Sequence, residues 1–184
     1  MSSNARSEKP APGIYFVGSF KIANEEKIMA TDPCYSDGDK EIGNIKPGTW
    51  NAYTELVYAG NWGLRNASLT VVHESLQNCP PKGDISEELG VCGVDAGMLG
   101  FYAMNGFSPG DDDDDYGDFD AISHSVRGDL RAAANDYGVT SCSGYGDGGY
   151  RIFAKADSKG KIVALEAVFI QDDKDSRFLD EEEE

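Results

Sequence analysis

Apolar and polar side chains alternate along residues 50–58. Trp50, Ala52, Thr54, Leu56 and Tyr58 fall on one face of an extended segment, and Asn, Tyr, Glu and Val side chains fall on the other. A period of two is typical of a strand that buries one face. We therefore predict a strand here with the Trp50 face buried, followed by a turn at 59–61 and a hairpin partner over 64–73.

Several other segments also have the pattern of strands. Residues 14–20 and 27–30 predict two short strands, and residues 91–104 predict a strand or a strand pair interrupted by glycines. Residues 151–156 and 161–170 flank a short polar turn and predict a second hairpin.

Charge, proline and a change of period mark the remaining segments. The charged residues 36–48 and the proline-containing residues 78–89 are interpreted as loops. Apolar side chains recur at helical spacing on one face further along the chain: Ile122, Val126, Leu130, Ala133 and Tyr137. We therefore predict an amphipathic helix over 121–137.

These elements predict a mainly β fold of the α+β class. We expect an antiparallel sandwich or a partly open barrel with one late amphipathic helix. A chain of 184 residues fits one domain. That domain is placed at 13–170 with an acidic loop at 109–120, between a disordered N-terminal tail (1–12) and a mobile acidic C-terminal tail (171–184).

The chain is strongly acidic, with 33 acidic and 16 basic residues and a net charge of −17. Residues 111–115 and 180–184 hold ten of the acids, and without them the charge is still −7, so the acidity is general. Such a surface repels nucleic acid and anionic membranes. We expect no direct binding to either, which leaves a basic host protein, a cation or a small ligand as partner classes.

Sequence features also indicate the compartment. No apolar stretch approaches the roughly 20 residues that span a bilayer, and the N-terminal residues lack the apolar core of a secretory signal. We predict a cytoplasmic protein. The cysteines Cys34, Cys79, Cys92 and Cys142 show no CxxC spacing, so we expect reduced thiols rather than disulfides or a zinc site.

Three segments place an aspartate beside proline or glycine at the end of an apolar run. They are TDPCY with Asp32, GVDAGMLG with Asp95 and SGYGDGGY with Asp147. Two interpretations remain open. The carboxylates converge to bind a divalent cation or perform acid–base chemistry, or each aspartate bonds backbone N–H groups in its own turn.

The glycine-rich segment 143–150 also carries aromatic side chains. Its amides resemble those that cradle phosphate, but it lacks the Lys-Ser/Thr ending of a P-loop. Its two tyrosines, with Trp50 or Trp62, suit stacking on a ligand ring or covering a sheet. The predicted ligand-binding set is Asp32, Tyr35, Asp95, Tyr145, Asp147, Tyr150 and Arg151.

The acidic loop 109–120 is a candidate for weak binding of calcium or magnesium. An EF-hand alignment fails, because Tyr116 occupies the fifth position and Ser123 stands where a bidentate Glu is needed. A solvated loop and a weak cation site remain as alternatives. The candidate metal ligands are Asp112, Asp114, Asp118 and Asp120.

Cys34 with His73 or His124 has the composition of a thiol nucleophile and its base. No hydrolase signature surrounds Cys34, so we interpret it as a buried structural thiol. If the chain is an enzyme, the candidate catalytic residues are Asp32, Asp95, Asp147, Cys34 and His73.

The order of the three aspartate segments resembles that of a family of small bacterial and phage proteins, a domain of unknown function. TDPCY-type, VDAG-type and SGYGDG-type elements recur in that family, followed by a strand matching residues 160–169. The resemblance spans about residues 13–170. It implies one domain and a bacterial or viral cytosolic setting, and it implies no reaction.

Acidity without a complete catalytic signature favours a non-enzymatic binding protein, and enzymatic activity is left open. We predict that the chain, of phage origin if the resemblance holds, engages or sequesters a host component or a small ligand through its Gly/Asp-rich turns. The alternatives are a metal-assisted hydrolase using the aspartates of those turns, and a structural or assembly protein.

Overall fold

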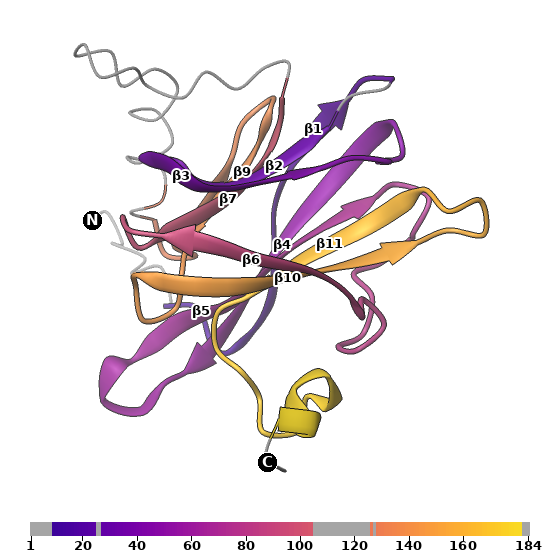
Figure 1. Cartoon of the computed structure of the whole chain (residues 1–184). Coiled ribbons are helices and arrows are strands. Elements are labelled where there is room, and N and C mark those ends of the chain that lie inside the picture. Colours follow the sequence, from indigo (N-terminus) through magenta and orange to yellow (C-terminus); the bar gives the residue numbers. More distant parts are fainter. Residues whose placement is uncertain (1–8, 25–26, 105–125, 127, 182–184) are drawn as a thin grey trace, which may run out of the picture.

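Two antiparallel β-sheets form the protein (Figure 1), in a computed structural model that describes residues 9–24, 27–104, 126 and 128–181. The six-stranded sheet has the order β1 (Gly13–Ile22), β4 (Gly48–Tyr58), β5 (Leu64–His73), β11 (Ile162–Val168), β10 (Gly148–Ala156) and β6 (Glu87–Val94). The five-stranded sheet has the order β3 (Tyr35–Ile42), β2 (Ile28–Asp32), β7 (Met98–Ala103), β9 (Gly138–Cys142) and β8 (Ala132–Ala134). The described 3-10 helices are η1 (Gly60–Trp62) and η2 (Ser176–Glu181).

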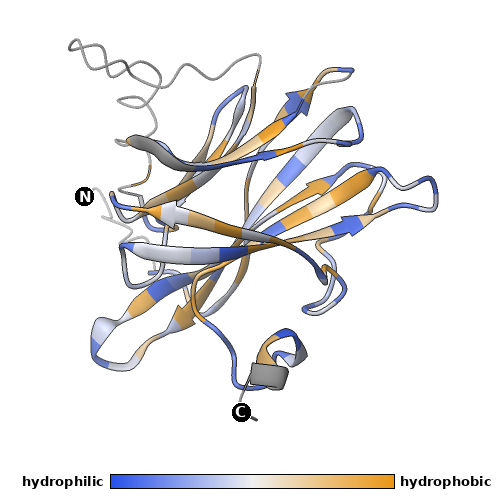
Figure 2. Ribbon diagram, in the orientation of Figure 1, coloured by the Kyte–Doolittle hydropathy of each residue, from blue (hydrophilic) through white to orange (hydrophobic). Residues whose placement is uncertain are grey.

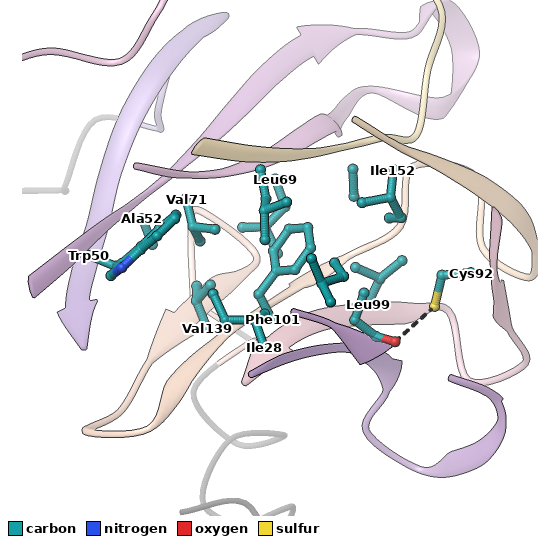
Figure 3. Packing of buried hydrophobic residues seen from close by; sticks show 14 of the residues in the cluster. Ile28, Trp50, Ala52, Leu69, Val71, Cys92, Leu99, Phe101, Val139 and Ile152 are labelled. Atoms are coloured by element: carbon teal, nitrogen blue, oxygen red, sulfur yellow. Dashed lines mark hydrogen bonds between the residues drawn. The ribbon is translucent and has the colours of Figure 1, made fainter. Parts of the chain in front are cut away.

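The core lies between the two sheets and takes side chains from both (Figure 3). Trp50, Leu69 and Ile152 come from the six-stranded sheet, and Ile28 and Phe101 come from the five-stranded sheet. Each is buried, and burial of one large apolar side chain contributes about 1.5–3 kcal/mol. The predicted antiparallel sandwich is confirmed, and the described strands do not close into a barrel.

Burial alternates along β4 as in a half-buried strand, whereas the central strand β11 is buried along its whole length and is largely hydrophobic (Figure 2). Strand β4 buries the predicted face from Trp50 to Leu56 and pairs with β5, which confirms this hairpin. Tyr58 departs from the prediction, with 71% of its surface exposed. It is the last residue of the strand and lies beside the hairpin turn, opposite Leu64.

Most of the other predicted strands are also present. The N-terminal strand is β1, and the predicted second hairpin is formed by β10 and β11. Residues 91–104 contain the second half of β6 and all of β7, which belong to different sheets. The turn at 95–97 therefore carries the chain from one sheet to the other.

The prediction of a loop at 36–48 is wrong, because β3 extends over Tyr35–Ile42. It pairs with β2, placing Lys40 opposite Ala30, and it forms an edge of the five-stranded sheet. Edge strands tolerate and often require charged side chains, which prevent pairing with other chains. Charge in this segment therefore marked an edge rather than a loop.

The helix predicted over 121–137 is wrong for its described C-terminal part. Ala132–Ala134 form the short edge strand β8, which pairs with β9. The side chain of Asn135 accepts hydrogen bonds from the N–H groups of Tyr137 and Gly138, both at 2.9 Å, and turns the chain into β9. Residues 121–125 and 127 lie outside the described residues.

The C-terminal residues do not form a mobile tail over their described length. In residues 171–178, which we call the C-terminal segment, the Asp175 and Arg177 side chains are only 4% and 5% exposed. Arg177 forms ion pairs with Asp175 and with Glu166 of β11, so the segment is held against the six-stranded sheet.

Two groups of predictions lie outside the described residues. They are the disordered tail up to residue 8 and the candidate metal ligands Asp112, Asp114, Asp118 and Asp120. Within the described part of the chain, no helix has the length and apolar character needed to cross a lipid bilayer.

Candidate functional site

The three aspartate-bearing turns lie together at one end of the sandwich, where β6 ends and β10 begins (Figure 1). Asp32 connects two of them. One carboxylate oxygen accepts a hydrogen bond from the N–H of Cys34 at 2.8 Å, within its own turn. The other oxygen accepts bonds from the N–H groups of Asp95 (2.7 Å) and Ala96 (2.6 Å) in the turn between β6 and β7.

The glycine-rich turn 143–150 joins this cluster through backbone contacts. The N–H of Ser143 donates to the carbonyl of Gly97 at 3.0 Å. A methyl group on Gly97 would lie 3.7 Å from the Cα of Gly146 and 4.0 Å from a carboxylate oxygen of Asp147. The three turns therefore share one location, which we call the turn cluster.

The carboxylates of the turn cluster differ in what they contact. Asp32 is 2% exposed, and both of its oxygens accept backbone N–H groups. The side chains of Asp95 and Asp147 are exposed to solvent. Within the described residues, no group of three His, Cys, Asp or Glu side chains is arranged to hold a metal ion. Asp32 therefore bonds the backbone of its own turn, as one interpretation predicts. It also connects that turn to the turn between β6 and β7, so the aspartate segments converge, as the other predicts.

Cys34 and His73 are not arranged as a nucleophile and its base. The Nδ1 atom of His73 accepts a hydrogen bond from the N–H of Ser75 at 3.0 Å, so its proton lies on Nε2, which donates to the carbonyl of Pro47 at 3.0 Å. Partial burial and the charge of Asp32 raise the pKa of Cys34 to about 11, whereas a reactive thiol requires a lowered pKa.

Two further predictions fall on these residues. The interpretation of Cys34 as a buried thiol is wrong, because it is exposed in the turn between β2 and β3. All four cysteines are free thiols. His124 lies outside the described residues, as does the side chain of Tyr35, although the backbone of Tyr35 begins β3.

Tyr150 organises the glycine-rich turn from within. Its hydroxyl lies 2.9 Å from the carbonyl oxygen of Ser143 and 2.5 Å from that of Gly146, so its proton is donated inside the turn. Its ring packs edge-on against Phe169, with the ring centres 5.2 Å apart. Gly144 has a φ of +59°, and a methyl group there would lie 3.1 Å from the Cβ of Phe169. Glycine is therefore needed for both conformation and space.

An open cleft of about 580 Å³ lies beside this turn. The turn and the start of β10 form one side, and the end of β11 with the C-terminal segment forms the other. The aromatic lining residues are Tyr145, Tyr150, Phe169 and Phe178, and the polar ones are Arg151, Gln171 and Asp173. Small-ligand sites are typically clefts of about 300–1,000 Å³ with mainly apolar walls and a few polar groups.

The arginine that lines the cleft contacts two neighbouring side chains. The Arg151 guanidinium lies 5.2 Å from the ring centre of Phe178, and its Nε atom is 3.5 Å from a carboxylate oxygen of Glu88. Phe178 in turn packs edge-on against Phe153, with ring centres 5.7 Å apart. Asp173 is exposed at the rim.

The aromatic rings outside the core form a small surface next to the cleft. Tyr145 is 54% exposed and packs edge-on against Trp62, which is 59% exposed, with ring centres 5.6 Å apart. Arg65 lies over the Trp62 ring at 5.6 Å. Trp50 is buried and donates its indole N–H to the carbonyl of Lys46, so of the two tryptophans only Trp62 is placed to contact a ligand near Tyr145.

The structure thus places the predicted ligand-binding residues in two neighbouring groups. Asp32, Asp95 and Asp147 belong to the turn cluster, whereas Tyr145 and Tyr150 line the cleft together with Arg151.

Sequence reasoning missed four other lining residues, which are Phe169, Gln171, Asp173 and Phe178. The available signal was an aromatic residue beside an arginine, Arg177-Phe178, inside a segment interpreted as a solvated tail.

Comparison with protein-family models, with curated proteins and with solved structures finds no match for this chain. The resemblance to the family of small bacterial and phage proteins therefore stays a prediction that depends on the three aspartate segments.

Proposed function

We propose that the chain is a binding protein that holds a small organic ligand in the cleft between the glycine-rich turn and the C-terminal segment. The observation that carries this proposal is the cleft itself, which has a volume of about 580 Å³ and is lined by four aromatic and three polar side chains. A volume of this size lies within the range of small-molecule sites.

The construction of both walls supports the same proposal. Tyr150 is fixed by bonds to two backbone carbonyls, and Phe178 is fixed between Phe153 and Arg151. A site whose groups are held before the ligand arrives loses less conformational entropy on binding. Tyr145 is the exposed ring, so it is free to pack against the ligand.

The test is a titration of the ¹⁵N-labelled chain with a library of small organic fragments, followed by NMR. We expect some fragments to shift the backbone amides of Gly149, Tyr150 and Gln171, and to raise the melting temperature, because only binding to the folded state stabilises it. Tyr145→Ala should weaken these fragments about tenfold or more, as loss of a central aromatic contact does.

Tyr137→Ala is the matched control, because Tyr137 is 44% exposed and lies between β8 and β9 of the other sheet. It should leave fragment affinity unchanged. Absence of any fragment that shifts the cleft amides, or equal losses from Tyr145→Ala and Tyr137→Ala, would contradict the proposed function.

A further inference from the structure

The charges around the cleft disfavour an anionic ligand. The whole chain carries a net charge of −17, which lowers the local concentration of anions at its surface. Arg151 is the cationic side chain that lines the cleft, and Glu88 lies 3.5 Å from it. Asp173 adds a carboxylate to the same lining. A phosphate or carboxylate group would therefore meet an arginine whose charge is already largely balanced.

The same arginine disfavours a cationic ligand. Cations bind aromatic sites by lying over a ring face. In this cleft Arg151 already lies 5.2 Å from the ring centre of Phe178. The Phe178 ring is therefore already in contact with a cation of the protein, and the Tyr150 hydroxyl is turned into its own loop rather than toward a ligand.

The other lining side chains suit a neutral cyclic ligand that has an apolar face and polar groups around its edge. Tyr145 offers an exposed aromatic ring, which packs against an apolar face. Gln171 and Asp173 lie exposed in the opposite wall. An amide side chain both donates and accepts hydrogen bonds, and a carboxylate accepts them strongly. Sugar rings have this two-sided character, with C–H groups on one face and hydroxyl groups around the edge.

We infer that the cleft binds a neutral saccharide, with one sugar ring packed on Tyr145 and its hydroxyl groups bonded to Gln171 and Asp173. This inference rests on the proposed function and assigns the chemical class of its ligand. A cleft of about 580 Å³ lies within the size range of small-ligand sites, so a mono- or disaccharide fits it.

The experiment is an NMR titration of the full chain with defined probes. The saccharides are the methyl glycosides of glucose, galactose, mannose and N-acetylglucosamine, with maltose and cellobiose. The comparison probes are inorganic phosphate, tetramethylammonium and benzyl alcohol. Concentrations up to about 10 mM detect dissociation constants in the millimolar range, which is the weak end of specific binding.

We expect at least one saccharide to shift the amides of Gly149, Tyr150 and Gln171. Tyr145→Ala should weaken that saccharide about tenfold or more, and Tyr145→Phe should keep its affinity within about threefold, because the ring provides the contact. Affinity should also be the same in low and high salt, since a neutral ligand has no charge to be screened.

Other outcomes overturn the inference in distinguishable ways. If tetramethylammonium or benzyl alcohol shifts the cleft amides and no saccharide does, the saccharide assignment is wrong and the proposed function stands. If only phosphate shifts them, the cleft is an anion site and both the assignment and the proposed function are wrong. If a saccharide binds but Tyr145→Phe weakens it as much as Tyr145→Ala, the packing on Tyr145 is wrong. If no probe and no fragment shifts these amides, both the assignment and the proposed function fail.

Discussion

Two of the buried carboxylates, Asp32 and Glu166, lie in different regions and are stabilised in different ways. Asp32 in the turn cluster is 2% exposed and accepts three hydrogen bonds from backbone N–H groups. Glu166 on β11 is 6% exposed and accepts a hydrogen bond of 2.5 Å from the Arg177 guanidinium. One negative charge is thus held by neutral donors, and the other by a cation.

The difference shows how each wall of the cleft is positioned. The backbone donors of Asp32 tie two turns together, and the third turn follows through the bond from Ser143 to Gly97. On the other side, Arg177 bonds Glu166, Asp175 and the carbonyl of Ile85, which brings its neighbour Phe178 to the cleft. Neutral backbone donors thus connect the turn of Asp32 to a turn 63 residues further along the chain, whereas one arginine with several donors connects the C-terminal segment to β11 and to Ile85.

The largest expected effect on stability comes from removing the cation that pairs with Glu166. Arg177→Ala leaves the carboxylates of Glu166 and Asp175 buried without their cation. Removing one partner of a buried ion pair costs about 3–5 kcal/mol, so we expect a loss of this size in the free energy of unfolding. Urea denaturation measures it, and proteolysis of the C-terminal segment should become faster.

A second variant separates the ion pair from packing. Glu166→Gln combined with Arg177→Met keeps the bulk of both side chains and removes the Glu166 charge together with its cation, while Asp175 stays ionised without Arg177. It should therefore recover only part of the stability lost in Arg177→Ala. A loss of less than about 1 kcal/mol in Arg177→Ala, as for an exposed ion pair, would show that Arg177 does not hold the segment.

An intermediate effect on stability is expected from disrupting the hydrogen bonds between Asp32 and its backbone N–H donors. Asp32→Asn keeps the shape of the side chain but turns one oxygen into an NH₂ group, which faces a backbone N–H. At least one donor among Cys34, Asp95 and Ala96 then loses its acceptor, and each unsatisfied buried donor costs about 1–3 kcal/mol. We expect a loss of about 2 kcal/mol, measured by urea denaturation.

Asp147→Asn is the matched control for Asp32→Asn, because Asp147 lies in the same turn cluster with an exposed side chain. It should change stability by less than about 0.5 kcal/mol. If both substitutions had the same effect, burial of Asp32 and its three bonds would not be what joins the turns.

The smallest expected effect is a pH dependence that belongs to Glu166. Burial raises the pKa of Glu166 above its ordinary 4.5, and Arg177 only partly opposes this. The folded state therefore binds the proton more tightly than the unfolded state, so the contribution of Glu166 to stability increases as the pH falls from neutral toward 4.5. Asp175 acts oppositely, because its bond to Arg177 lowers its pKa below 3.8 and its contribution is lost in stronger acid.

Urea denaturation of the native chain and of Glu166→Gln between pH 8 and about 4.5 measures this difference. The stability of the native chain relative to the variant should rise as the pH is lowered. A relative stability that falls over this interval would show that Arg177 outweighs burial at Glu166.

Alternation of side chains made most of the fold predictable. The buried face of β4, the partner strand β5 and the hairpin of β10 and β11 all follow from local patterns, because a strand that buries one face must alternate. The three aspartate segments were likewise recognisable from their glycines and prolines. Tyr145, Tyr150 and Arg151 were placed in the ligand-binding set for the same local reason.

Elements whose conformation or burial depends on a pairing partner, whether near or far in the chain, were not predictable in this way. Charged β3 is a strand because it pairs with β2, and Ala132–Ala134 form a strand because β9 offers an edge. Asp32 holds the turn after β6 only once two sheets have brought those residues together. The Arg177 side chain is buried because it forms an ion pair with Glu166 on β11.

The order of residues thus specifies the local conformations, the acidity and the turn chemistry of this protein, since these depend on neighbours along the chain. The tertiary structure decides which turns meet and which wall faces Tyr145 across the cleft. The physical reason is that a buried carboxylate needs hydrogen-bond donors within the protein. Whether those donors are backbone N–H groups of another turn or the guanidinium of an arginine depends on how the sheets pack.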